Sequence, residues 1–157
     1  MRGILLAVGA AVVLGACSGD GGNGADERQA AIYAAAIETV ASETGSAAMP
    51  FDGPVYVVAS PGYDIGIEIQ VDVVEQLDDL TIRFVDERDE AIKESADDAP
   101  VLGDGLLVTL GKIRGSGGRR TVPLGAYLRL DDDERYEVTL ERRDGRWVVT
   151  DQASRES

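Results

Sequence analysis

Apolar and polar residues alternate along the last third of the chain, and this alternation constrains the fold most. The pair Asp144-Gly145 favours a two-residue type I′ hairpin turn, which would pair Arg142 with Trp147 and Leu140 with Val149. The residues that then share the apolar face are Tyr136, Val138, Leu140, Trp147 and Val149, and those on the polar face are Glu137, Thr139 and Glu141. Because register and burial agree, the pattern predicts two paired antiparallel strands.

Two more strands are predicted ahead of this hairpin, over Leu106–Ile113 and Thr121–Leu130. The glycine-rich stretch Gly115–Gly118 between them is typical of a flexible hairpin tip. A charged turn over Asp131–Glu134 would lead into the final hairpin, Arg135–Arg142 and Arg146–Thr150. The C-terminal part is therefore expected to be a four-stranded antiparallel meander.

An amphipathic helix is predicted over residues 26–44. Asp26 is a suitable N-cap, Gln29 stands where a capping box needs it, and Gly45 is a plausible C-cap. Five apolar residues recur at helical spacing: Ala30, Tyr33, Ile37, Val40 and Ala41. This stripe is expected to cover the protein's own sheet, although such a helix could also bind a partner or a membrane.

The middle of the chain is less regular. Val55–Ala59 and Thr81–Val85 are predicted strands. Residues up to about 69 are expected to be irregular or extended, residues 70–79 helical, and residues 86–94 one or two helical turns. The order of elements predicts an α+β fold, with the N-terminal helix packed on a curved, mainly antiparallel sheet that ends in a meander of long hairpins. Residues 26–151 would form one domain, and residues 152–157 would fray.

The N-terminus has the pattern of an export signal. Arg2 precedes the apolar run Ile4–Leu14, whose 11 residues reach only about 16 Å as a helix, about half of a hydrocarbon core. The run ends in Leu14-Gly15-Ala16-Cys17, and Cys17 is the only cysteine. This motif resembles the lipobox of bacterial lipoproteins. The alternative is an ordinary signal peptide followed by an unrelated cysteine.

The resemblance to lipoproteins implies that residues 1–16 are a cleaved signal peptide and that the Cys17 thiol carries a diacylglyceryl group with chains such as palmitate. Residues 17–25 would then be the lipidated cysteine and a flexible glycine-rich tether. The protein would lie on the extracytoplasmic side of the cell membrane and contact it through the lipid. The chain is also similar to small lipoproteins of actinobacterial type, and the order of elements in residues 26–151 resembles NTF2-like and cystatin-like folds.

Composition excludes several classes of function. The chain has no histidine, and Cys17 is assigned to lipid, so histidine-dependent catalytic triads, histidine-based zinc sites and a thiol nucleophile are excluded. No phosphate-binding loop or dinucleotide fingerprint is present, and we expect no cofactor and no metal ion. A net charge of −14 makes nucleic acid an improbable partner.

Local charge clusters leave alternatives open. The acidic segment from Asp64 to Asp98 could attract cations or a basic partner, but it is more simply a solvated face. Asp131–Glu134 could hold Ca²⁺, but it lacks the spacing of an EF-hand loop. Four basic residues flank the glycine tip, Lys112, Arg114, Arg119 and Arg120. They could contact anionic headgroups or wall polymers, or they could only discourage edge pairing.

The favoured function is therefore a non-enzymatic binding or accessory domain of the cell envelope, with a small molecule or an envelope protein as its partner. The alternative is a carboxylate-dependent hydrolase in an NTF2-like pocket, and a third possibility is a structural envelope lipoprotein. A cavity that holds a buried carboxylate would favour the enzyme. A filled core beneath the N-terminal helix would favour the interaction module.

Overall fold

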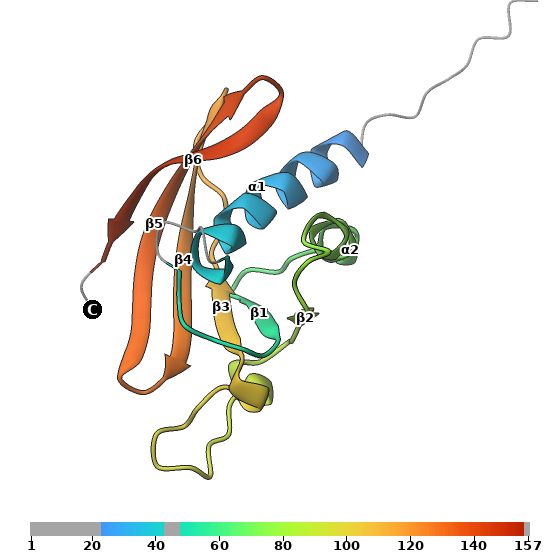
Figure 1. Cartoon of the computed structure of the whole chain (residues 1–157). Coiled ribbons are helices and arrows are strands. Elements are labelled where there is room, and N and C mark those ends of the chain that lie inside the picture. Colours follow the sequence, from blue (N-terminus) through green and yellow to red (C-terminus); the bar gives the residue numbers. More distant parts are fainter. Residues whose placement is uncertain (1–22, 43–47, 156–157) are drawn as a thin grey trace, which may run out of the picture.

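The sheet has six strands in the order β2-β1-β3-β4-β5-β6, and two helices pack on one of its faces (Figure 1). It is seen in a computed structural model, which describes residues 23–42 and 48–155. The elements are α1 Asn23–Ala41, β1 Val55–Ala59, α2 Ile67–Gln76, β2 Ile82–Phe84, the short 3₁₀ helices η1 Arg88–Ala91 and η2 Leu102–Asp104, β3 Leu106–Leu110, β4 Arg119–Arg129, β5 Asp132–Arg143 and β6 Arg146–Ser154. The predicted α+β class is confirmed, as is the N-terminal helix packed on a mainly antiparallel sheet.

The predicted meander is confirmed as the antiparallel series β3-β4-β5-β6. Arg142 pairs with Trp147 and Leu140 with Val149, as the hairpin pattern predicts. Both residues of the Asp144-Gly145 turn have positive φ, 50° and 83°. A type I′ turn requires positive φ at both central residues, which explains why Asp-Gly fits this turn.

The ends of two strands in the meander differ from the prediction. The charged turn expected over Asp131–Glu134 is wrong, because β5 already begins at Asp132 and the loop after β4 is only Leu130 and Asp131. The prediction that the chain frays from residue 152 is also wrong for residues 152–155, which are paired with β5. The register of the β5–β6 pair shifts between Thr139 and Leu140, where β6 has one extra residue. The backbone pairing of β6 with β5 nevertheless continues to Ser154. The Arg155 amide donates to the Arg135 carbonyl at 2.7 Å.

Helix α1 begins at Asn23, three residues before the predicted N-cap Asp26. The tether predicted up to residue 25 is therefore helical over Asn23–Ala25, and Asp26 lies in the first turn, where a carboxylate favours the positive end of the helix dipole. The predicted apolar stripe is confirmed, because Ala30, Tyr33, Ile37, Val40 and Ala41 are all buried. The predicted C-cap Gly45 lies outside the described residues, as do Cys17 and the rest of the predicted signal sequence.

The helix predicted over 70–79 is present as α2, shifted toward the N-terminus to Ile67–Gln76. Ile69, Val73 and Leu77 are buried at helical spacing. Ile67, which lies in the stretch predicted to be irregular or extended, is 66% exposed on the outer face of this helix, and Val71 is 47% exposed. The helical period therefore decides the structure here, because it buries more apolar surface against α1 and the sheet.

Strand β1 lies between β2 and β3 and is parallel to both, an arrangement that the sequence did not predict. Its alternate residues therefore enter two cores. Val55 and Val57 belong to the main core beneath α1 and α2, whereas Tyr56 and Val58 belong to a smaller core on the other face. The smaller core also contains Val101, from the segment between β2 and β3. Figure 1 shows α1 lying across the sheet with α2 beside it.

Candidate functional site: two clefts beside the start of α1

Two open clefts of opposite charge flank the first turns of α1. The basic cleft has a volume of about 500 Å³ and is lined by Ala25, Arg28, Gln29, Ile32, Tyr63, Asp64, Ile69, Lys112, Ile113 and Arg120. The acidic groove has a volume of about 590 Å³ and is lined by Asp26, Glu27, Ala31, Glu68, Asp72, Glu75 and Gln76. Helix α1 thus presents Arg28 to one cleft and the carboxylates of Asp26 and Glu27 to the other.

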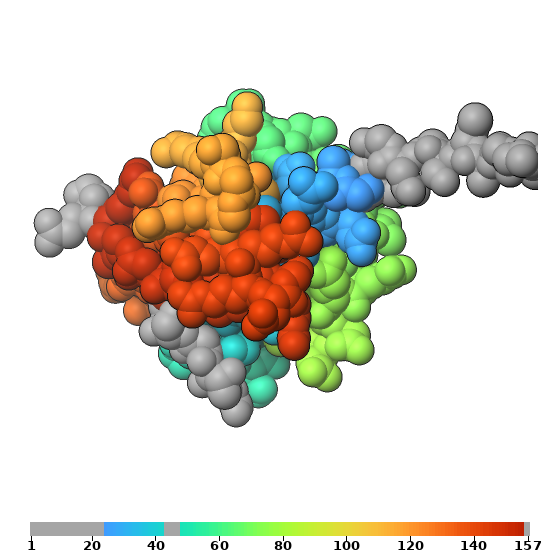
Figure 2. Space-filling view, turned by 90° about the horizontal axis from the view of Figure 1, so that it is seen from above, coloured from blue at the N-terminus to red at the C-terminus, as the bar shows by residue number. Residues whose placement is uncertain are grey.

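Three segments that are distant in the sequence meet at the basic cleft. They are the start of α1, the chain just before and within α2, and the connection from β3 to β4. Figure 2 shows the blue start of α1, a green segment and the light-orange β3–β4 connection gathered on one part of the surface. An isolated antiparallel bridge between Arg114, which follows β3, and Thr121 of β4 holds this connection.

Tyr63, which lines the basic cleft, is hydrogen-bonded to the buried Tyr33 behind it. The Tyr33 hydroxyl lies 2.8 Å from that of Tyr63 and 3.2 Å from the Gly111 carbonyl oxygen, and the Gln29 amide donates to Tyr63 at 2.7 Å. Burial raises the pKa of the Tyr33 phenol well above its ordinary value of 10.0, and the hydrogen bond with Tyr63 adds to the rise. The predicted capping-box role of Gln29 is therefore wrong, because its side chain is used in this network.

The Arg120 guanidinium is fixed at the edge of the basic cleft. Its Nη1 atom donates to the carbonyl oxygens of Gly117 and Arg119 at 2.7 and 2.9 Å. Its central carbon lies 5.5 Å from the centre of the Trp147 ring, within range of a cation–π interaction. Neither contact neutralises the charge, so Arg120 is held in place and remains cationic.

The structure divides the four predicted basic residues into two pairs. Lys112 and Arg120 line the basic cleft, whereas Arg114 and Arg119 lie on the same hairpin tip outside it. All four are exposed or half-buried. Among the described residues, no carboxylate forms an ion pair with any of them. The structure therefore brings only two of the four predicted residues into one cleft.

Sequence reasoning missed Arg28 and Tyr63 as partners of these cations. Arg28 is exposed on the first turns of α1, and its guanidinium donates to the Gly24 carbonyl at 3.1 Å. Tyr63 follows Ser60-Pro61-Gly62, a sequence that indicates a turn but no functional site. The sequence does place Gln29 and Tyr33, two side chains with polar groups, close together on α1. It does not show which distant segment they contact.

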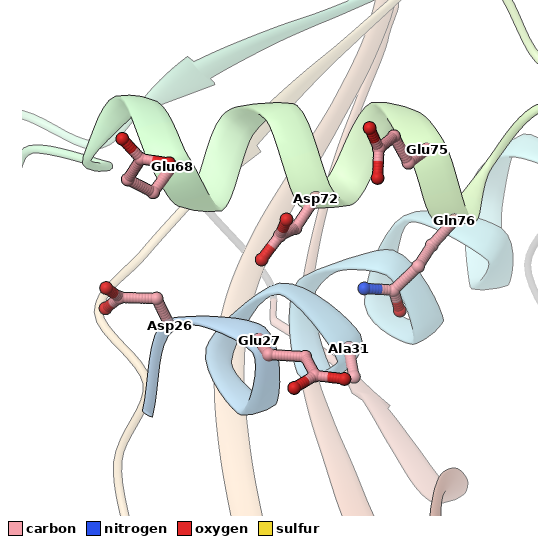
Figure 3. Close-up of a pocket in the computed structure, with 7 residues that line it drawn as sticks. All are labelled: Asp26, Glu27, Ala31, Glu68, Asp72, Glu75 and Gln76. Atoms are coloured by element: carbon pink, nitrogen blue, oxygen red, sulfur yellow. The ribbon is translucent and has the colours of Figure 1, made fainter. Parts of the chain in front are cut away.

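Figure 3 shows the acidic groove between α1 and α2, with Asp72 and Gln76 of α2 pointing toward Asp26 and Glu27 of α1. The carboxylates of α2 recur at spacings of three and four residues, so they lie on one helical face. The groove carries five carboxylates and no basic side chain. It can repel anions and attract cations, but each of its carboxylates is at least partly exposed to water.

The Asp131–Glu134 segment, weighed above as a calcium site, has other partners. Asp132 pairs with Arg129 at 3.0 Å, and Asp133 lies 3.9 Å from Arg88. Within residues 23–42 and 48–155, no group of three or more acidic side chains is arranged to hold a metal ion. In the same part of the chain, no helix is both long enough and apolar enough to cross a membrane.

Comparisons with protein-family models, with curated proteins and with solved structures gave no match to this chain. The resemblance to lipoproteins stays a prediction from the lipobox. The resemblance to NTF2-like and cystatin-like folds stays a prediction from the order of elements.

Proposed function

We propose that this chain is an extracytoplasmic lipoprotein, anchored through a diacylglyceryl group on Cys17, whose domain is a non-enzymatic binding or accessory module of the cell envelope. The observation that carries the second half of this proposal is the filled core beneath α1. Tyr33, Ile37 and Val40 are fully buried against the sheet. The helix and the sheet thus enclose side chains where an NTF2-like enzyme would need a pocket.

The burial of carboxylates supports the same proposal. No aspartate or glutamate in residues 23–42 and 48–155 is buried. An acid–base carboxylate usually needs a desolvated, enclosed position, because burial shifts its pKa toward the working pH. Both clefts beside α1 are open, so they suit recognition of a surface group better than chemistry that excludes water.

The start of α1 lies close to the proposed anchor. Asn23 follows Cys17 by six residues, and a chain of this length spans at most about 20 Å when fully extended. If Cys17 is lipidated, both clefts beside the start of α1 are held within reach of the headgroup layer. The module would then work at the membrane surface, while its lipid supplies stable attachment.

The alternative is a carboxylate-dependent hydrolase, and the acidic groove is where its catalytic pair would lie. Three α2 carboxylates line it, Glu68, Asp72 and Glu75, and Glu68 and Asp72 are one pair on consecutive turns. A hydrolase would lose its function in a Glu68→Gln, Asp72→Asn double variant. The binding module proposed here should still complement a strain that lacks the protein, and failure of a stably folded variant to complement would favour the enzyme.

The anchor is tested with a labelled fatty acid in cells that express the wild-type chain, Cys17→Ala or the neighbouring control Ser18→Ala. The wild type and Ser18→Ala should incorporate the label and fractionate with the membrane. Cys17→Ala should lose the label and accumulate as uncleaved precursor. Label in Cys17→Ala, or normal cleavage of its signal sequence, would contradict lipid attachment at this residue.

A further inference from the structure

The basic cleft concentrates cations in a chain that is otherwise strongly acidic. Arg28, Lys112 and Arg120 line it, and Asp64 is its only carboxylate. None of these three cations forms an ion pair within the described residues. In a chain of net charge −14, acidic partners are abundant elsewhere, so three unpaired cations around one hollow mark a place where an anion is stabilised.

The positions of these cations are partly fixed before any ligand binds. Arg120 is held by two carbonyl oxygens of the hairpin tip and by the Trp147 ring, which leaves other N–H groups of its guanidinium to donate. Arg28 extends from α1, and its guanidinium donates to the Gly24 carbonyl oxygen at 3.1 Å. A preorganised guanidinium binds an oxyanion better than a mobile one because less side-chain entropy is lost on binding.

The tyrosine pair adds a neutral donor to the same cleft. When Tyr33 donates to Tyr63, the Tyr63 oxygen accepts from both Tyr33 and Gln29. Its own O–H proton is then left to donate into the cleft that Tyr63 lines. Three isoleucines, Ile32, Ile69 and Ile113, supply apolar surface beside the charged groups.

We infer that the basic cleft binds a phosphate group, with Arg28, Lys112 and Arg120 neutralising its charge and Tyr63 donating a hydrogen bond. Guanidinium groups match the oxygen geometry of phosphate, and a lysine ammonium adds a point charge. A volume of about 500 Å³ holds a small phosphate ester. The phosphate can belong to a free ester or to a lipid headgroup. The second source rests on the proposed membrane anchor, whereas the site itself does not.

The test uses residues 17–157 with Cys17→Ser, which is unlipidated and contains every described element. Binding of glycerol 3-phosphate is measured by calorimetry, and binding to vesicles by sedimentation, with phosphatidylglycerol vesicles compared with phosphatidylcholine ones. Ionic strength is about 0.15 M, where the Debye length is about 8 Å and the distant carboxylates are screened. Since the chain carries no lipid, failure of the anchor would not affect these measurements.

Two double variants separate the cleft from general electrostatics, since each removes two positive charges, one pair from the cleft lining and the other from outside it. Arg28→Gln with Lys112→Gln changes the cleft, and Arg114→Gln with Arg119→Gln changes its surroundings. We expect the first pair to weaken phosphate binding tenfold or more, and the second to change it less than twofold. Binding of the free ester identifies a soluble ligand, and binding of phosphatidylglycerol vesicles alone identifies a headgroup. No binding in either arm, or equal losses in both double variants, would overturn the inference.

Discussion

The two sides of α1 differ in how their charges are arranged. On the side of the basic cleft, hydrogen bonds join the α1 side chains Gln29 and Tyr33 to Tyr63, and Tyr33 also contacts the Gly111 carbonyl. Arg120 donates to two carbonyl oxygens of its own hairpin and lies over the Trp147 ring. On the side of the acidic groove, carboxylates from two helices face one another without any basic side chain among them. The first arrangement is preorganised for an anion, and the second is a set of like charges that are exposed to solvent.

This difference teaches that charge alone does not define a site in this protein. The acidic groove is the larger of the two and carries more charged residues. Its carboxylates nevertheless lie on helix surfaces, where solvent screens them. The cations of the basic cleft are fewer, but they converge with a buried tyrosine network and are held by contacts that do not neutralise them.

The largest expected effect is on the packing of α1, the helix whose first turns both clefts share. Ile37→Ala should reduce the free energy of unfolding by about 2–5 kcal/mol, because Ile37 is fully buried beneath α1 and the change leaves a cavity. Chemical denaturation measures this loss. Ile67→Ala is the control, since Ile67 is 66% exposed and its loss should cost little. Equal effects of the two changes would show that α1 is not packed on the sheet as described.

The second-largest effect on stability is expected for the hydrogen bonds beside the basic cleft. Tyr33→Phe removes the hydroxyl that contacts Tyr63 and the Gly111 carbonyl, and it should cost about 1–2 kcal/mol in the free energy of unfolding. Tyr136→Phe is the matched control because the Tyr136 hydroxyl has no hydrogen bond within the described residues. Denaturation of both variants should show a loss only for the first. An unchanged free energy of unfolding in Tyr33→Phe would contradict a structural role for the tyrosine network.

Alkaline pH gives a related test of the same network. Because the pKa of Tyr33 is raised in the folded protein, the unfolded chain loses this proton first as pH rises through about 10. Stability is therefore retained below pH 10 and falls above it, by at most about 1.4 kcal/mol per pH unit for this one proton. Urea denaturation between pH 9 and 11 should show a shallower fall in Tyr33→Phe. Identical slopes would mean that Tyr33 ionises as easily in the folded protein as in the unfolded chain.

The smallest effect is expected in the acidic groove and has the opposite sign. Asp72→Asn removes repulsion with Glu68, which lies four residues earlier on α2, and should stabilise the protein by about 0.2–0.5 kcal/mol at low salt. The gain should vanish in 1 M salt. Asp151→Asn on the exposed surface of β6 controls for net charge. Destabilisation by Asp72→Asn would show that this carboxylate has a favourable partner and that the two clefts are less different than described.

The sequence predicts best where the signals are local. The Asp144-Gly145 turn fixes its own register, and the hairpin from Arg142 to Trp147 follows from alternation alone. Strand β1 is also found at its predicted bounds. Its parallel pairing with β2 and β3 could not be predicted, because parallel partners are joined by long connections and no turn signal identifies them.

Only part of the basic cleft could be predicted from the sequence, because some of its residues are close together in the chain and others are not. Lys112 and Arg120 stand in one local cluster of cations, which is readable without a structure. The contact between Tyr33 and the Gly111 carbonyl spans 78 residues, and that between Gln29 and Tyr63 spans 34. Such contacts depend on how α1 lies across the sheet, so only the folded chain brings Arg28 and Tyr63 to the two cations.

The contrast between the two clefts is tested most directly by mapping where a phosphate ester binds. The unlipidated Cys17→Ser chain is labelled with ¹⁵N, and its amide resonances are followed by NMR as glycerol 3-phosphate is added. We predict saturable shifts at Gln29, Tyr63 and Lys112, which line the basic cleft, and none over Asp72–Gln76 in the acidic groove. Shifts in the acidic groove, or shifts spread evenly over the surface, would contradict the account.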